Sequence, residues 1–304
     1  MGDDKSNKII QVMIAFAIGI VVFCLFSPAV GYGLCDFDDK LYLEIDSIWA
    51  FKESTWMPLT QLSYSLDRLV GCGHHWQSIL IHAVNAALLY LLLFRVSDRK
   101  VGLPLLATLI WAVHPLRVES VVWIASRKDL VSFFWLALAL ISWVRWRMSG
   151  RGYSAGYWLS LLFLVVGAFG KPSVMVFPGL VAVVDGLVLR CLKPRLDGQW
   201  NPKAVVPYLL PLALGLLIAV EATAFQNLGG AMGVPAPLWA RVLNACVSYG
   251  VYLRNEVCPT NLALQCMMQY PGLPHFLIGG LVVFGACMWF FFGKARALVR
   301  LGWT

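Results

Sequence analysis

Long apolar stretches, repeated along the whole sequence, are the feature that most restricts how this chain folds. A transmembrane helix needs roughly 20 mostly apolar residues, and several runs approach or reach that length. Hydrophobic residues make up 60% of the 304 positions and charged residues 13%, whereas soluble domains hold about 25% charged residues. An ordinary soluble enzyme, a disordered chain and a fibrous repeat are therefore excluded. The apolar runs are Ile9–Val30, Ser78–Phe94, Val101–Val113, Leu130–Val144, Tyr153–Gly170, Pro172–Leu189, Val205–Phe225 and His275–Phe292.

The number of these runs predicts an all-α polytopic membrane protein with about eight transmembrane helices. The first run follows Lys5 and Lys8 and exceeds the roughly 7–15 apolar residues of a cleavable signal peptide, so we expect it to remain as the first span. Charged and amide residues interrupt Leu238–Val257, which favours an interfacial helix there over a further span. We expect one membrane domain over residues 1–304, without tetratricopeptide repeats.

Basic residues predict the orientation of this bundle. With a cytoplasmic amino terminus, 15 of the 24 Lys and Arg residues fall on the cytoplasmic side, as the positive-inside rule requires. The net charge of +8 thus reports orientation first, and we expect no nucleic-acid partner. The membrane is expected to be a bacterial inner membrane or the endoplasmic reticulum. The opposite side receives a first outer loop over about residues 31–75 and outer segments over about residues 114–129 and 226–274.

The first outer loop contains the adjacent carboxylates Asp38 and Asp39, shortly after the first span. One carboxylate of such a pair can act as general base toward an incoming hydroxyl group while the other orients it. Ordinary surface acids at a hydrated loop mouth explain the spacing equally well. Later in the loop, Trp56 and apolar residues at helical spacing predict a helix along the outer membrane surface, which either walls a cleft or caps the bundle.

The outer segment over about residues 114–129 carries a second set of candidate functional residues. Its start, His114 followed by Pro115, suits the first turn of a new helix. Glu119, Trp123 and Arg127 follow at four-residue intervals, so we expect them to share one face of that helix.

Cations at the outer boundary are not needed to orient the chain. Arg127 and Lys128 suit a phosphate or pyrophosphate group, the first by paired hydrogen bonds and the second as a point charge. Lys171 stands alone between two apolar runs, where an isolated cation is costly without a partner. For Arg127 and Lys128, the alternative is that the side chains snorkel to the membrane surface, with Glu119 and Asp129 as ion-pair partners.

The histidines do not form a recognisable metal site. His75 and His82 lie two turns apart on one helix face, too far to share an ion without a third ligand. We therefore expect no divalent metal, and predict that His82 and Asn85 hydrogen-bond to neighbouring helices.

Several segments, taken in order, resemble the membrane domain of the transmembrane and tetratricopeptide-repeat O-mannosyltransferase family and its bacterial relatives, which are GT-C glycosyltransferases. The segments that carry the resemblance are Phe37–Tyr42, Trp56–Thr60, Gly73–His75, His114–Glu119, Arg127–Asp129, Lys171–Pro172, Tyr252–Leu253 and Pro259–Ala263. The resemblance implies a GT-C-like helical bundle whose first outer loop contains an interfacial helix.

The resemblance also implies a reaction. A mannose-like sugar would pass from a polyprenyl-phosphate donor to a hydroxyl group, expected to be a protein Ser or Thr, on the non-cytoplasmic face. Asp38 is the expected catalytic base and Asp39 its partner. The residues expected to bind the donor phosphate are Arg117, Arg127, Lys128 and Lys171, and those expected to support the site are Trp56, His114, Glu119 and Trp123.

The sequence departs from the family pattern in two respects. Met57 occupies a position where family members often have His. Relatives continue into further spans and repeats beyond the point where this sequence ends, so a short form of the membrane domain is expected. The alternatives are a non-catalytic or truncated subunit that binds lipid phosphate or a partner subunit, and a lipid-sugar flippase, which cations along a continuous transmembrane path would favour.

Overall fold

The computed structural model describes residues 2–35, 38–44, 56–71, 73–97, 100–188, 204–228, 237–260 and 262. The chain forms two compact units, Met1–Met232 and Gly233–Thr304, and each is described by itself. The expected single domain stays a prediction. The last apolar run, His275–Phe292, lies outside the described residues.

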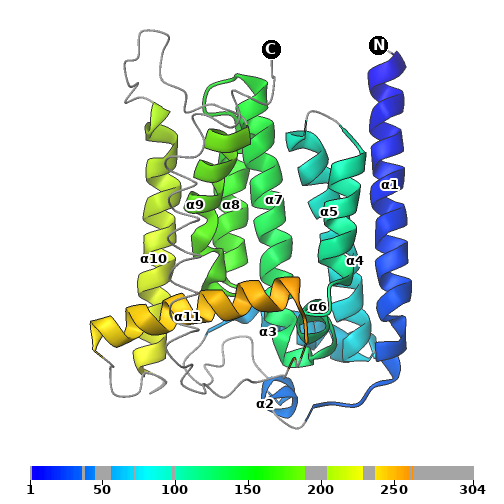
Figure 1. The fold of residues 1–304 in the computed structure, drawn as a ribbon, viewed down its shortest axis with the longest axis vertical. Helices are drawn as coiled ribbons and strands as arrows, with labels where there is room; N and C mark the ends of the chain where they lie inside the picture. The colour runs from blue at the N-terminus through cyan, green and yellow to red at the C-terminus, as the bar shows by residue number, and fades with distance from the viewer. Residues whose placement is uncertain are drawn as a thin grey trace. The chain divides into compact units, whose positions relative to one another are not determined.

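The described part of the chain is helical and contains no strand (Figure 1), which confirms the predicted all-α class. The elements of the first unit are α1 (Gly2–Phe26), the 3₁₀ helix η1 (Ser27–Gly31), α2 (Asp39–Leu43), α3 (Pro58–Val70), α4 (His74–Val96), α5 (Gly102–Val113), α6 (Arg117–Val122), the 3₁₀ helix η2 (Ile124–Ser126), α7 (Arg127–Ser149), α8 (Ala155–Ala168), the 3₁₀ helix η3 (Pro172–Val176), α9 (Phe177–Val183), the π-helix η4 (Val184–Val188) and α10 (Val206–Leu228). The second unit contributes α11 (Leu238–Val257).

Three of the described helical segments are long and apolar enough to cross a membrane: Ser6–Gly31, His74–Val96 and Val206–Leu228. Shorter apolar helices cover Gly102–Val113, Ala155–Ala168 and Pro172–Gly186. The chain is thus a helical membrane protein, while the expected count of about eight spans stays a prediction.

Apolar side chains face outward as well as inward in the first unit. On α1, Met13 and Phe16 are 64% and 70% exposed, whereas Ile18 and Val22 are buried against α4 in one hydrophobic core. A second core lies around Trp143 of α7. Helices with apolar residues on every side are typical of membrane spans.

Small residues bring α7 and α8 close together. A Cβ atom on Gly156 of α8 would lie 3.2 Å from the Ser142 carbonyl oxygen and 3.0 Å from the Trp146 Cβ of α7. Glycine permits this approach of two backbones, as at many helix contacts in membranes.

Of the helix predicted over Trp49–Asp67, the described part is helical from Pro58 as α3, and Trp56 precedes it. The buried face of α3 is its polar one. Leu62, Leu66 and Leu69 are exposed, while Ser63 and Asp67 are buried. An apolar outer face with a polar inner face suits a helix at the membrane boundary.

The predicted common helix face of Glu119, Trp123 and Arg127 is wrong. α6 ends at Val122, Trp123 has extended backbone with ψ 113°, and α7 begins at Arg127. The Ala125 backbone N–H donates to the Asp39 carboxylate at 2.8 Å instead of to a helical carbonyl. This contact from a distant segment interrupts the helix that the spacing predicted.

Candidate functional site: a lysine-lined pocket at one end of the bundle

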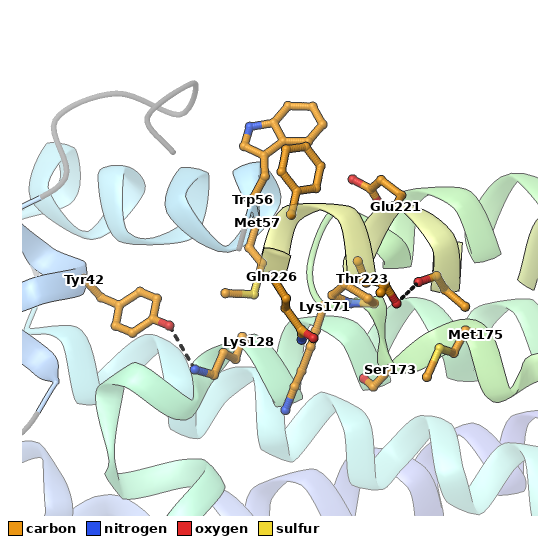
Figure 2. A pocket seen from close by; sticks show the side chains of 14 residues that line it. Tyr42, Trp56, Met57, Lys128, Lys171, Ser173, Met175, Glu221, Thr223 and Gln226 are labelled. Carbon is orange, nitrogen blue, oxygen red and sulfur yellow. Dashed lines mark hydrogen bonds between the residues drawn. The ribbon is translucent and has the colours of Figure 1, made fainter. Parts of the chain in front are cut away.

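A pocket of about 380 Å³ lies at the end of the first unit where α10 finishes. It is lined by α2, the residues just before α3, the first turn of α7, the start of η3 and the last turns of α10 (Figure 2). Its volume falls within the range of about 300–1,000 Å³ typical of ligand sites. Two ammonium groups, those of Lys128 and Lys171, belong to its lining.

Lys128 is held by an aromatic side chain from the first outer loop. Its Nζ donates to the Tyr42 hydroxyl at 3.1 Å and lies 4.7 Å from the centre of the Tyr42 ring. Figure 2 shows the two side chains meeting along one wall of the pocket. A neutral hydroxyl and a ring face orient the ammonium group without neutralising its charge.

Lys171 precedes Pro172, the residue that starts η3, and its Nζ donates to Asp129 Oδ1 at 2.5 Å. Both partners are about one-third exposed; Lys171 lines the pocket, whereas Asp129 does not. Thr60 Oγ1 donates to the Gly170 carbonyl at 2.9 Å, which fixes this corner to α3. Lys171 therefore has a protein partner in the fold, and its contact with the donor phosphate stays a prediction.

Another part of the lining is mainly apolar and contains one carboxylate, that of Glu221. Trp56 packs against Phe169 and Phe225, with ring centres 5.7 and 6.2 Å apart, and Met57 is buried beside it. Glu221 near the end of α10 also lines the pocket. The cavity therefore combines two cations, one carboxylate and an aromatic wall.

The adjacent carboxylates of the first outer loop have different environments. Asp39 is 1% exposed, and its two oxygens accept the backbone N–H groups of Cys35 and Ala125, both at 2.8 Å. Asp38 occupies the position before α2, is partly exposed and makes no capping hydrogen bond. Asp39 thus organises the loop, while the Asp38 carboxylate is left available to solvent.

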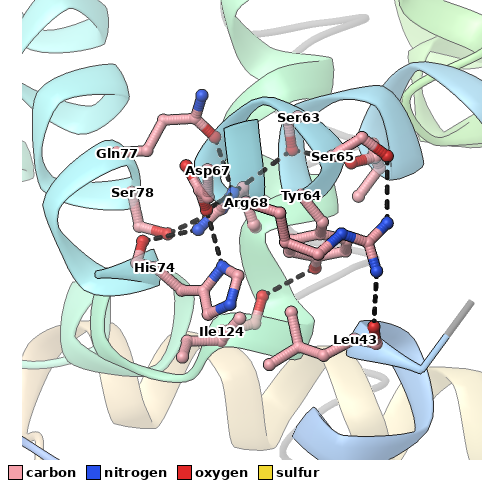
Figure 3. A network of polar contacts seen from close by, with 12 residues as sticks. Leu43, Ser63, Tyr64, Ser65, Asp67, Arg68, His74, Gln77, Ser78 and Ile124 are labelled. Carbon is pink, nitrogen blue, oxygen red and sulfur yellow. Dashed lines mark hydrogen bonds and ion pairs between the residues drawn. The ribbon is translucent and has the colours of Figure 1, made fainter. Parts of the chain in front are cut away.

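Arg127, the first residue of α7, is fully buried. Figure 3 shows its partners from α3 and α4, among them Asp67 and Gln77. Its guanidinium contacts Asp67 Oδ2 at 2.6 Å, Gln77 Oε1 at 2.6 Å, the His74 carbonyl oxygen at 2.5 Å, Ser78 Oγ at 3.0 Å and Ser63 Oγ at 3.4 Å. This side chain, expected to bind the donor phosphate, lies among protein partners and away from the pocket lining.

The Tyr64 ring packs against the Arg127 guanidinium, and the Tyr64 hydroxyl contacts η2. Its ring centre lies 4.6 Å from the Arg127 Cζ, and its hydroxyl donates to the Ile124 carbonyl at 2.8 Å. Burial raises the pKa of Tyr64, and the charge of Arg127 opposes that rise without cancelling it. Tyr64 therefore remains a neutral hydrogen-bond donor that connects α3 to η2.

A smaller cavity of about 210 Å³ adjoins the pocket through Ser173, which lines both, and through the ion pair of Asp129 with Lys171. Arg117 lines this smaller cavity, not the lysine-lined pocket. Its guanidinium lies 5.4 Å from the Trp111 ring centre. The lining is rich in hydroxyl groups, with Ser120 among them.

His82 and Asn85, both fully buried, belong to the lining of this smaller cavity. His82 Nε2 contacts the Ala112 carbonyl at 2.9 Å and Asn85 Nδ2 donates to the Leu130 carbonyl at 2.9 Å, which confirms the predicted hydrogen bonds between helices. The other polar atoms, His82 Nδ1 and Asn85 Oδ1, have no protein partner. Because buried polar atoms are normally hydrogen-bonded, these two acceptors favour water or a hydroxyl-bearing ligand.

Glu119 lies within electrostatic reach of both cavities. Loss of water contact, followed by the neighbouring Asp129 carboxylate, raises the pKa of Glu119, and the charges of Lys171 and Arg117 only partly oppose this rise. His114 and Trp123 belong to the same outer segment, and His114 Nδ1 accepts the Leu116 backbone N–H at 3.3 Å. Neither of these two side chains lines the lysine-lined pocket.

The structure thus brings together Lys128, Lys171 and Trp56 of the predicted site residues. Sequence reasoning gave no functional part to Asp67 or Tyr42. A signal for Asp67 was present, because the polar stripe that it shares with Ser63 follows helical spacing. Tyr42 belongs to the segment Phe37–Tyr42 of the family resemblance, but no spacing in the sequence indicated its contact with Lys128.

Fold and site together define a helical membrane protein with a cationic pocket at one end of its bundle. Among curated proteins, the chain is similar to Protein O-mannosyl-transferase Tmtc2 of Drosophila melanogaster, with 28% identity over 205 residues, 62% of this chain and 21% of that protein. It is also similar to Protein O-mannosyl-transferase TMTC2 of Mus musculus, with 30% identity over 107 residues, 34% of this chain and 13% of that protein. The chain therefore spans about a fifth or less of the length of these relatives. No family model and no solved structure matches it.

Proposed function

We propose that this chain is a GT-C-like membrane glycosyltransferase domain. It transfers a mannose-like sugar from a polyprenyl-phosphate donor to a hydroxyl group of a protein acceptor on the non-cytoplasmic face. The observation that carries this proposal is the pair of ammonium groups of Lys128 and Lys171 in the lining of one pocket. The similarity to proteins named as O-mannosyltransferases supports the reaction class.

The two lysines have the chemistry that the departing lipid phosphate requires. Negative charge builds on the phosphate as the bond to the sugar breaks, and fixed cations in a site with little water stabilise it. Trp56 and Met57 supply an apolar wall for the first part of the lipid chain. The smaller cavity, whose lining includes His82, Asn85 and Ser120, is assigned to the sugar hydroxyls.

Asp38 remains the proposed general base. It is partly exposed at the start of α2, the helix that carries Tyr42 into the pocket lining. A carboxylate in this position can accept the proton of the attacking hydroxyl. Asp39 fixes the loop through its two backbone hydrogen bonds.

A transfer assay tests the proposal. Purified full-length protein in detergent is given radiolabelled polyprenyl-phosphate mannose and a Ser/Thr-rich peptide, and labelled peptide is counted. Lys171→Gln is expected to slow transfer about 100-fold, the typical effect of removing one group that stabilises developing charge. Lys100→Gln, in the loop between α4 and α5 at the other end of the first unit, is the matched control and should retain full activity.

The Asp38→Asn variant tests the base separately, with Glu44→Gln, an exposed acid in the same loop, as its control. Loss of transfer in Asp38→Asn alone supports the assignment. Equal activity in Asp38→Asn and the unaltered protein contradicts it.

A non-catalytic subunit that binds lipid phosphate is the second candidate. It is favoured by the internal contacts of Asp39 and Arg127, two predicted site residues that the fold already uses. This candidate predicts that the protein binds polyprenyl-phosphate mannose with an affinity that depends on Lys128 and Lys171, but releases no labelled product with any acceptor.

A further inference from the structure

Glu221 places a carboxylate inside a helix that is long and apolar enough to cross a membrane. It is the only Asp, Glu, Lys or Arg residue of α10, and it lies seven residues before Leu228, where that helix ends. Seven residues correspond to about 10 Å of helix. Ionisable side chains within a transmembrane segment are costly, and they mark a functional site unless the fold supplies a partner.

The fold supplies no such partner to Glu221. Its side chain is partly buried and forms no hydrogen bond or ion pair with any residue that the structure describes. The two cations of the same pocket are engaged elsewhere, because the Lys171 ammonium contacts Asp129 at 2.5 Å and the Lys128 ammonium donates to the Tyr42 hydroxyl. The lysine-lined pocket therefore contains a carboxylate whose charge the described protein leaves unpaired.

Aromatic side chains lie next to Glu221 in the pocket lining. Phe225 follows one helical turn later on the same face of α10, and its ring centre lies 6.2 Å from that of Trp56. Figure 2 shows Trp56 and Glu221 along one edge of the pocket and Lys128 along the other. A carboxylate beside aromatic rings suits an Arg or Lys side chain, because the rings attract its charge and pack against its apolar stem.

The pocket thus offers opposite charges to two different ligands. The lysines suit the donor phosphate, whereas Glu221 suits a cation, which the proposed donor does not carry. A basic acceptor supplies that cation and satisfies the desolvated carboxylate with charge-assisted hydrogen bonds. An acidic acceptor is repelled by Glu221, and a neutral one leaves it without a partner, so the carboxylate distinguishes acceptors by their charge.

We propose that Glu221 selects the acceptor, by binding the side chain of an Arg or Lys residue next to the Ser or Thr that receives the sugar. This inference rests on the proposed function, because it concerns the acceptor of that reaction. Glu221 acts in specificity, while proton acceptance stays with Asp38 and binding of the donor phosphate with Lys128 and Lys171.

Fluorescence anisotropy of the full chain in a non-ionic detergent tests this inference without requiring turnover. Three labelled peptides are compared, identical except that a central Ser is flanked by Arg, by Gln or by Glu. We expect the Arg peptide to bind about tenfold more tightly than the Gln peptide, the effect of one hydrogen bond to a charged group. Glu221→Gln should reduce this ratio to about one. Glu221→Lys should make the Glu peptide the tightest, which a merely structural role of Glu221 would not produce.

The controls separate Glu221 from general surface charge and from misfolding. Glu44→Gln removes an exposed acid of the first outer loop and should keep the tenfold ratio, and melting temperatures of all variants are measured in the same detergent. Equal binding of the three peptides by the unaltered protein, or a ratio that persists in Glu221→Gln, overturns the inference.

Transfer of labelled mannose to the same three peptides separates this inference from the proposed function. Transfer that does not depend on peptide charge overturns the selection by Glu221 and leaves the proposed function standing. Charge-dependent binding that is lost in Glu221→Gln, without transfer to any peptide, supports the basic partner and overturns the proposed function. Absence of binding by all three peptides overturns the inference.

Discussion

At the scale of single residues, the Arg127–Asp67 pair shows how one charged side chain can be structural at a site where sequence alone predicted ligand binding. The adjacent cations Arg127 and Lys128 have opposite surroundings. Arg127 is fully buried on protein acceptors, whereas Lys128 reaches the pocket with a hydroxyl as its partner. Burial of a guanidinium is tolerable only with paired charge and satisfied hydrogen bonds, and α3 and α4 supply both.

Removing one partner of this pair is expected to destabilise the fold. Asp67→Asn leaves Arg127 buried without an opposite charge, and loss of one partner of a buried ion pair costs about 3–5 kcal/mol. Denaturant unfolding in detergent measures the loss of unfolding free energy. Arg68→Gln alters the exposed neighbouring residue and should change stability by less than about 1 kcal/mol. Similar losses in the two variants contradict a structural role for the pair.

Glu119 is expected to make stability depend on pH. Its pKa is raised in the folded protein, chiefly by loss of water contact, so the folded state favours the protonated carboxyl more than the unfolded state does. This contribution to stability is present below the ordinary pKa of 4.5 and decreases as the pH rises through the folded-state pKa. Melting temperatures measured against pH should show this decrease in the unaltered protein and not in Glu119→Gln. Glu44→Gln serves as control and should keep it.

At the scale of helices, the sequence predicted those helices whose length and apolar composition are enough to identify them. It did not predict helix ends that depend on a contact with a distant segment. Apolar runs marked α1, α4 and α10, because their length and composition suffice to identify a membrane helix. The break between α6 and α7 could not be predicted, since it depends on an Asp39 side chain 86 residues away from Ala125. The spacing of polar residues indicated the polar face of α3, but no pattern in the sequence indicated that Arg127 contacts this face.

The different environments of Asp38 and Asp39 lead to a prediction about how the first outer loop is held against η2. Asp39→Asn replaces one carboxylate oxygen by an NH₂ group that faces a backbone N–H donor, so one buried donor loses its acceptor at a cost of about 1–3 kcal/mol. We expect lower unfolding free energy and faster amide exchange at either Ala125 or Cys35, whichever N–H faces the new NH₂ group. Asp38→Asn is the matched variant and should leave stability and both exchange rates unchanged, because the Asp38 side chain makes no capping hydrogen bond. Unchanged exchange at both Ala125 and Cys35 in Asp39→Asn contradicts the assigned contacts.

At the scale of the whole molecule, the two ends of the first unit differ in chemistry. One end combines the lysine-lined pocket with the buried Arg127 network. The other end carries a cavity with three cations and no acidic residue among its described lining. The predicted sidedness follows from the same charges, since positively charged loops remain on the cytoplasmic side. The sidedness decides which aqueous phase the lysine-lined pocket meets, so it calls for a measurement of its own.

Cysteine labelling in sealed cells provides that measurement. In a background with the native cysteines replaced, Glu44→Cys at the pocket end is expected to react with a membrane-impermeant maleimide in intact cells. Lys100→Cys, between α4 and α5, should react only after the membrane is opened, because its positively charged loop is predicted to be cytoplasmic. Phe16→Cys, at a lipid-facing position that is 70% exposed in the fold, should remain unreactive in both conditions, since the reaction requires a thiolate in water. Labelling of Lys100→Cys in intact cells reverses the orientation and moves the proposed transfer site to the cytoplasmic face.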